Sequence, residues 1–197
     1  NNFLFDFLKK KTPNFGWLSE ESLDDKSRFE CDFFWCLDPI DGTRSYISGK
    51  PEYTISLALI NNFQPILGII YNPTTNEYFH AEKNKGAFCN NRQIKVNSKT
   101  NYEVCSLAIS SSEMNILKSY NFFNSTDVKK IGSIAYKIAL VAKGKIDIAI
   151  SLTKKNDWDL AAADLLIKEA HGKIMETSGE KIIYNTQNLN INSVMAA

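Results

Sequence analysis

The sequence predicts a layered α/β fold, with an antiparallel sheet in the first half and alternating strands and helices in the second. Residues 54–96 contain short β-branched and apolar runs separated by asparagine-rich turns, which is typical of successive hairpins. Residues 133–176 alternate apolar segments of helix length with segments of strand length. We therefore expect two sub-domains, residues 1–100 and 101–197, that divide near residues 98–103.

The first half begins with Asn2–Lys11, whose apolar residues and final three lysines predict the last turns of a helix. Ser19–Arg28 is polar and acidic and predicts a loop, and Asp32–Leu37 predicts a short buried strand. Thr54–Ile60 and Pro65–Asn72 flank two asparagines and predict a hairpin. Three further short strands are expected, at Glu77–Glu82, Gly86–Cys89 and Gln93–Val96.

The second half is expected to start with a strand at Val104–Ser110, followed by a helix at Ser133–Lys143 and a strand at Lys145–Ser151. Trp158–His171 predicts a helix that is apolar on nearly every face, and such a helix is buried between layers. A strand at Lys173–Glu176 follows it.

Composition excludes several classes of function. The 197 residues include 23 basic and 22 acidic ones, a formal net charge of +1, whereas proteins that hold nucleic acid or an anionic membrane need a basic excess. The longest apolar runs, Ile55–Ile60 and Ile66–Tyr71, fall far below the ~20 residues of a membrane-spanning helix. The four cysteines form no CxxC pair, so neither zinc nor a disulfide framework is expected and a cytoplasmic location is the default. Asn1–Asp6 has no methionine and no basic segment, so we expect the natural chain to start upstream.

The most informative motif is Asp38-Pro39-Ile40-Asp41-Gly42-Thr43, which follows the buried strand. Two carboxylates three residues apart at a strand end, with a proline that fixes φ and a glycine that relaxes the turn, can converge on one point. Converging carboxylates repel each other and need a hard cation between them. The alternative is a solvated turn, because Asp, Pro and Gly are all frequent turn formers.

A second acidic pair stands at the start of the apolar helix. Asp157 is expected to cap this helix, which leaves Asp159 inside an almost wholly apolar segment, where a carboxylate needs a partner such as a cation. The pair Glu20-Glu21 is by itself more typical of a solvated loop. No GxSxG, HExxH or GxxxxGK[ST] motif is present, so the sequence offers no nucleophile of those kinds.

Taken together, these segments closely resemble the inositol monophosphatase superfamily of metal-dependent phosphomonoesterases. The resemblance rests on four stretches in this order: Ser19–Ser22, Asp38–Thr43, Gly132–Ser133 and Trp158–Ala163. It implies an alternating α-β-α-β-α sandwich, Mg²⁺-dependent hydrolysis of a small phosphate monoester, sensitivity to lithium, and a possible homodimer.

The resemblance also implies roles for individual residues. The metal ligands would be Glu20, Asp38, Asp41, Asp159 and the backbone carbonyl of Ile40, holding two or three Mg²⁺ ions. Glu20 and Thr43 would be the catalytic pair that positions the attacking water. The substrate would be bound by Asp41, Gly42, Thr43 and Asp159, with backbone N–H groups of Gly42 and Thr43 on the phosphate, a role that suits a helix N-terminus.

Several positions depart from the family pattern. Ala163 and His171 stand where the family has glycine, and the chain lacks both the aspartate motif that family members carry upstream of Glu20 and the final helix. Leu152 stands where inositol phosphatases present a glutamate to the sugar hydroxyls, followed by Lys154 and Lys155, which would suit a second phosphate or form a solvated loop.

Three functions therefore stay open. The first is a phosphatase acting on a small sugar or inositol phosphate. The second is a 3'(2'),5'-bisphosphate nucleotidase that converts adenosine 3',5'-bisphosphate to AMP. The third, of a different class, is a regulatory or binding module that uses the same fold without turnover.

Overall fold

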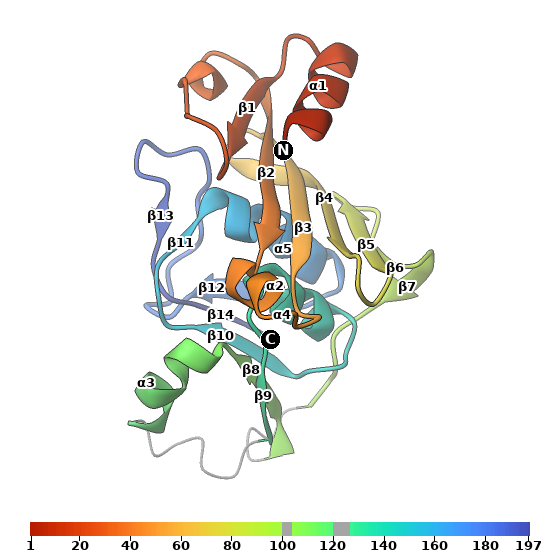
Figure 1. Cartoon of the computed structure of the whole chain (residues 1–197). Coiled ribbons are helices and arrows are strands. Elements are labelled where there is room, and N and C mark those ends of the chain that lie inside the picture. Colours follow the sequence, from red (N-terminus) through yellow and green to blue (C-terminus); the bar gives the residue numbers. More distant parts are fainter. Residues whose placement is uncertain (100–103, 120–126) are drawn as a thin grey trace.

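The structure is a computed structural model that describes residues 1–99, 104–119 and 127–197 (Figure 1). Two sheets enclose a central pair of helices, α4 (Ile134–Ala142) and α5 (Asp157–Glu169), and each helix contacts strands of both sheets. The predicted layered α/β architecture is confirmed. The expected boundary at residues 98–103 lies largely outside the described residues, so the division into sub-domains stays a prediction.

The larger sheet has seven strands that lie side by side in chain order. The first pair is parallel and the others are antiparallel. The strands are β1 (Gly16–Ser19), β2 (Phe33–Asp41), β3 (Thr54–Asn61), β4 (Gln64–Asn72), β5 (Glu77–Glu82), β6 (Ala87–Cys89) and β7 (Arg92–Ile94). The predicted hairpin is confirmed: Asn62 and Phe63 connect β3 to β4 with φ of 47° and 62°, the left-handed backbone that suits tight hairpins.

The smaller sheet has five strands in the order β12 (Ile174–Glu176), β14 (Val194–Ala196), β10 (Ile148–Ser151), β8 (Ser106–Ile109) and β9 (Asp127–Lys130). A two-stranded ladder joins β11 (Lys155–Asn156) to β13 (Asn190–Ile191). The remaining helices are short or peripheral: α1 (Asn2–Lys11), α2 (Thr43–Ile47), α3 (Met114–Lys118) and the 3₁₀ turns η1 (Ser27–Phe29) and η3 (Ser111–Glu113).

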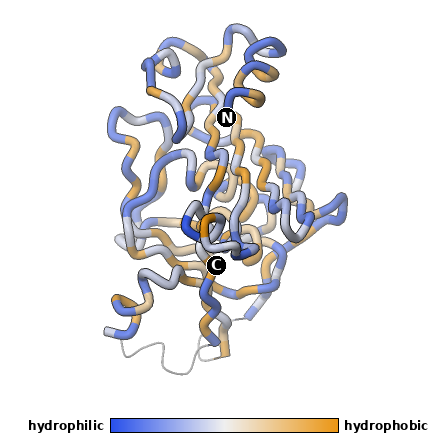
Figure 2. The backbone as a smooth tube through the Cα atoms, in the orientation of Figure 1, coloured by the Kyte–Doolittle hydropathy of each residue, from blue (hydrophilic) through white to orange (hydrophobic). Residues whose placement is uncertain are grey.

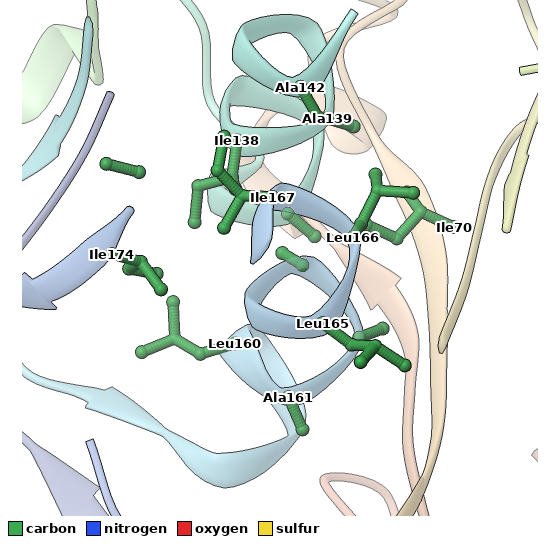
Figure 3. Packing of buried hydrophobic residues seen from close by; sticks show 14 of the residues in the cluster. Ile70, Ile138, Ala139, Ala142, Leu160, Ala161, Leu165, Leu166, Ile167 and Ile174 are labelled. Atoms are coloured by element: carbon green, nitrogen blue, oxygen red, sulfur yellow. The ribbon is translucent and has the colours of Figure 1, made fainter. Parts of the chain in front are cut away.

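The core lies around α5, which is buried on nearly every face as predicted. Figure 3 shows side chains of β4, α4 and β12, among them Ile70, Ile138 and Ile174, converging on this helix. Hydrophobic residues gather in the central strands and helices, whereas the peripheral loops are hydrophilic (Figure 2). No helix among the described residues has the length and hydrophobicity needed to cross a membrane.

Small residues allow α5 to approach the large sheet closely. A Cβ at Gly68 of β4 would lie 2.7 Å from the backbone oxygen of Ala162, so only glycine fits there. The cross-strand neighbours of Gly68 are Ala58 and Ala81, whose small side chains also leave room for the helix against the sheet. This contact fixes the position of the helix that carries Asp159.

Three expectations for individual segments were wrong. Ser19 ends β1 and Ser27–Phe29 forms a 3₁₀ turn, so the predicted loop at Ser19–Arg28 is shorter than expected. Strand β2 continues through the Asp-Pro-Ile-Asp motif to Asp41, and β10 begins only at Ile148. Local sequence did not indicate these limits because pairing with distant strands sets them.

Candidate metal centre

Three carboxylates from distant parts of the chain meet at one point. Asp38 and Asp41 lie near the end of β2, and Asp159 lies in the first turn of α5. One carboxylate oxygen from each lies within 4.8 Å of the others. No lysine or arginine of the described segments forms an ion pair with any of the three. Within the described residues, this cluster of negative charge therefore has no partner at ion-pair distance, although the more distant charges of Lys137 and Lys155 lower the pKa of Asp41 and Asp159, respectively.

An irregularity in β2 brings the first two carboxylates together. Side chains of a regular strand alternate between its faces, so residues three apart would point to opposite sides. Asp38 pairs with Ser56 and Asp41 with Thr54, so three steps on β2 match two on β3. An extra residue of this kind is a β-bulge, which turns the later side chain back toward the first face. Pro39 suits this position because it has no N–H to donate to the ladder.

Asp38 is almost fully buried, and its Oδ1 accepts a hydrogen bond of 2.8 Å from the backbone N–H of Ile40. Burial raises the pKa of Asp38, and the nearby carboxylates of Asp41 and Glu20 raise it further. The ionised form is therefore costly unless a cation arrives to offset the charge.

Asp41 is held by the start of α4. Its Oδ2 accepts hydrogen bonds from the Ser133 hydroxyl and from the backbone N–H of Ala135, the latter at 2.7 Å. Burial raises the pKa of Asp41 above its usual value even though these two hydrogen bonds lower it. Sequence reasoning assigned no role to Ser133, because the contact joins residues 92 positions apart.

Asp159 lies in the first turn of α5, but the capping arrangement differs from the prediction. The N-cap is Asn156, whose backbone N–H donates to Asp159 Oδ2 at 2.7 Å. Asp157 was expected as the cap, but the helix begins one residue earlier than expected, so Asp157 is already its first residue. Its buried carboxylate instead accepts a 2.7 Å hydrogen bond from the backbone N–H of Asn185. Burial, followed by the charge of Asp41, raises the pKa of Asp159 to about 7.

Glu20 lies immediately after β1, next to the metal-site end of β2. The parallel pairing of β1 with β2 places it there, and its backbone N–H donates to the Leu37 carbonyl at 3.2 Å. The side chain is exposed and lies outside the tight group of three, but its charge raises the pKa of both Asp38 and Asp159. It lines the same cavity as Asp41 and Asp159, which has a volume of about 560 Å³.

The other expected site residues lie at the turn from β2 into α2. Thr43 donates its hydroxyl to the Ile40 carbonyl at 3.1 Å, and a carbonyl has a second lone pair for a further partner. Gly42 has a φ of 90°, and a Cβ there would lie 2.9 Å from the Glu52 carbonyl oxygen. Gly42 and Thr43 both line the cavity. The structure therefore brings all the sequence-predicted site residues to one region.

The cavity also has a basic wall made of cationic side chains. Five cationic side chains line it, from α2, the following loop, β9 and the segment before α5, namely Arg44, Lys50, Lys130, Lys154 and Lys155. None of the five forms an ion pair within the described part of the chain. The cavity thus combines a cation-binding group of carboxylates with a wall that attracts anions.

Comparison with known proteins agrees with this geometry. The family model described as "Inositol monophosphatase family" matches residues 1–197. The chain belongs to the inositol monophosphatase family. The predicted superfamily resemblance is confirmed.

The chain is similar to several curated proteins. It is 31% identical over 183 residues to the fructose-1,6-bisphosphatase/inositol-1-monophosphatase of Thermotoga maritima, an alignment that covers 90% of this chain and 68% of that protein. It is 32% identical to the Nus factor SuhB of Xylella fastidiosa, over 87% of this chain and 64% of that protein. The chain therefore spans about two thirds of the length of these relatives.

Solved structures give the same fold. The Thermotoga maritima inositol monophosphatase covers all of this chain and 74% of its own, with a TM-score of 0.86 and 28% identity. Inositol monophosphatase II of Staphylococcus aureus matches with a TM-score of 0.88 over all of this chain and 74% of its own, at 23% identity, a likeness that shows the fold alone.

Two departures from the family pattern have a clear structural setting. His171 follows α5 with a φ of 66°, in the left-handed region that favours glycine at a helix end. Ala163 is fully buried within α5, facing the core. Neither position is part of the carboxylate cluster.

Proposed function

We propose that this chain belongs to a Mg²⁺-dependent phosphomonoesterase that hydrolyses a small sugar or inositol phosphate. The observation that carries the proposal is the convergence of Asp38, Asp41 and Asp159 within 4.8 Å, with no ion pair to any lysine or arginine among the described residues. Family membership supports a phosphatase with a small phosphate substrate.

The donor set fits a hard divalent cation. All the candidate ligand atoms are oxygens, and carboxylate, carbonyl and water oxygens suit Mg²⁺ rather than zinc. Asp38, Asp41 and Asp159 would hold the metal, with the Ile40 carbonyl and Glu20 as the further ligands that the family resemblance implies. When bound, such ions would offset the charge of the phosphoryl oxygens and lower the pKa of a bound water.

The residues of this chain would then bind and orient the substrate. Backbone N–H groups of Gly42 and Thr43 would hold the phosphate at the start of α2. Glu20 and Thr43, which both line the cavity, would form the pair that positions the attacking water, as the family resemblance implies. No covalent enzyme intermediate is needed, which is consistent with the missing nucleophile motifs.

The test is phosphate release by the full-length protein with Mg²⁺. Inositol monophosphate, adenosine 3',5'-bisphosphate and fructose 1,6-bisphosphate should be compared by kcat/KM, and Asp38→Asn should remove the activity. Inhibition by millimolar lithium is also expected. Equal turnover by wild type and Asp38→Asn, or none by either, would reject the proposal.

A bisphosphate substrate is the second candidate, and the basic wall favours it. The cavity lining has five cationic side chains and four carboxylates, and Asp38 of the metal centre adds a fifth carboxylate, so a bound divalent cation would leave a positive excess. A second phosphate on the substrate would match this excess. Higher kcat/KM for adenosine 3',5'-bisphosphate than for inositol monophosphate would select this candidate over the first.

We expect a cytoplasmic protein, in a possible homodimer, that binds neither nucleic acid nor membrane. A regulatory or binding module on the same fold is the alternative of another class, and similarity to proteins named Nus factor SuhB keeps it in view. Substrate turnover that depends on the carboxylates distinguishes the enzyme from the module.

A further inference from the structure

A buried carboxylate outside the metal centre braces one wall of the cavity. Glu113, at the end of η3, has only 2% of its surface exposed. Its Oε1 accepts hydrogen bonds from the Ser151 hydroxyl at 2.8 Å, from the backbone N–H groups of Leu152 and Thr153 at 2.8 and 3.0 Å, and from the Thr153 hydroxyl at 2.8 Å. Its Oε2 accepts from the Ser110 hydroxyl. One side chain thus joins two loops, and we call this set of hydrogen bonds the brace.

The two loops follow neighbouring parallel strands. β8 ends at Ile109 and β10 ends at Ser151, and their pairing makes the loops leave the same edge of the sheet. Both loops contribute to the cavity, through Ser110 on one side and Thr153 to Lys155 on the other. The contacts of Glu113 are therefore made directly behind residues that face the proposed substrate.

A buried lysine completes the brace. Lys137 of α4 is 1% exposed, and its Nζ lies 3.9 Å from Glu113 Oε2 and donates to the Ile150 carbonyl at 3.1 Å. Burial alone would raise the pKa of Glu113, but the Ser110 hydrogen bond and the Lys137 charge outweigh it and bring the pKa to about 2. Burial lowers the pKa of Lys137 to about 8, against the opposing effect of Glu113.

The brace extends to the basic wall through one hydroxyl. Thr153 Oγ1 donates to Glu113 and accepts a 2.9 Å hydrogen bond from Lys155 Nζ, which also donates to the Thr153 and Lys154 carbonyls. Lys155 is thereby folded onto its own loop. Glu113 itself cannot serve as a substrate ligand, because it is buried and five donors already occupy its two oxygens.

We propose that Glu113 is a positioning residue that fixes the Thr153–Lys155 segment as the substrate-recognition wall of the cavity. The proposal rests on the proposed function, since the wall acts on the substrate of that site. Through this segment, Glu113 supports binding of the part of the substrate that is not transferred. The carboxylate cluster binds the metal and, through it, the phosphoryl group.

The test is Glu113→Gln, which keeps the shape of the side chain but turns an NH₂ donor toward hydrogen-bond donors. Loss of two or three of the hydrogen bonds to the loop should raise KM about tenfold, with kcat within about twofold of wild type and Mg²⁺ affinity unchanged. Ser151→Ala removes a single donor and should raise KM less. If Glu113→Gln does not fold, Ser151→Ala carries the test.

The matched control is Asp147→Asn. Asp147 is also buried and accepts several hydrogen bonds, from Asn97, Lys99 and Ser106, but it does not line the cavity. A purely structural role for Glu113 would lower the active fraction, so apparent kcat would fall at constant KM in both variants. That result, or an equal rise of KM in Asp147→Asn, would overturn the proposal.

A second readout separates this inference from the proposed function. Amide hydrogen exchange at Leu152 and Thr153 should become faster in Glu113→Gln and stay unchanged in Asp147→Asn, whether or not the protein is a phosphatase. Unchanged exchange at both amides in Glu113→Gln would reject the brace. Absence of turnover in wild type, with faster exchange in the variant, would reject the proposed function and leave the brace established.

Discussion

Ser133 connects the fold to the candidate metal centre, and Ser133→Ala tests that connection. The hydroxyl is fully buried, accepts a 2.9 Å hydrogen bond from the Tyr136 N–H as the N-cap of α4, and donates to Asp41. Loss of a side-chain N-cap costs about 1 kcal/mol. Loss of a hydrogen bond to a buried carboxylate costs about 1.5–3 kcal/mol. We therefore expect the free energy of unfolding to fall by about 3 kcal/mol.

The assay is urea denaturation of the metal-free protein, followed by circular dichroism. Thr54→Val is the matched control, because Thr54 Oγ1 is equally buried and lies 3.1 Å from Ser133 Oγ, yet this hydroxyl neither caps the helix nor forms a hydrogen bond to the Asp41 carboxylate, although Thr54 is the cross-strand neighbour of Asp41. It should cost about 1 kcal/mol. A Ser133→Ala protein within about 0.5 kcal/mol of wild type, or no less stable than Thr54→Val, would show that the Ser133 hydroxyl does not stabilise the fold through the cap and Asp41.

Two further predictions concern packing and pH. Gly68→Ala places a Cβ 2.7 Å from the Ala162 carbonyl oxygen, which is a backbone atom that cannot rotate away. The free energy of unfolding should therefore fall by about 1–3 kcal/mol. A thermal unfolding midpoint equal to that of wild type would contradict this close packing. Hydrogen bonds from Ser106 and Lys99 outweigh the effect of burial and lower the pKa of Asp147 from 3.8 to about 2. Because the pKa of Asp147 is lower in the folded than in the unfolded protein, its ionised form stabilises the fold at pH values above about 4. This stabilisation is lost as the pH falls from about 4 to 2. Urea denaturation at several pH values in that range should show a steeper loss of unfolding free energy for wild type than for Asp147→Asn. The same pH dependence in both proteins would contradict the lowered pKa of Asp147.

Local patterns were sufficient for much of the fold. The β3–β4 hairpin follows from β-branched runs on either side of asparagines, and the burial of α5 follows from its apolar residues on all faces. The short strands β1, β9 and β14 were missed, because each has only three or four residues and is defined by its partner strands. Such pairing is set by tertiary context rather than by propensity.

For the candidate site, too, the sequence predicted some features and missed others. Asp38, Asp41 and Asp159 could be singled out because acidic residues beside apolar segments need a partner. The bulge that aligns the first two, and the roles of Ser133 and Glu113, could not be predicted, because each depends on contacts between residues far apart in the chain. Asp157 was misjudged as the cap because its true partner, Asn185, lies 28 residues downstream.

The proposed function depends on Asp38, Asp41 and Asp159 binding a divalent cation together. Isothermal titration of Mg²⁺ into the chelator-treated full-length protein tests it most directly, with Asp159→Asn as the comparison. We expect saturable binding to wild type and an affinity at least about tenfold weaker in the variant, since one of the three clustered carboxylates is lost. Equal affinity in the two proteins, or no binding to wild type, would contradict it.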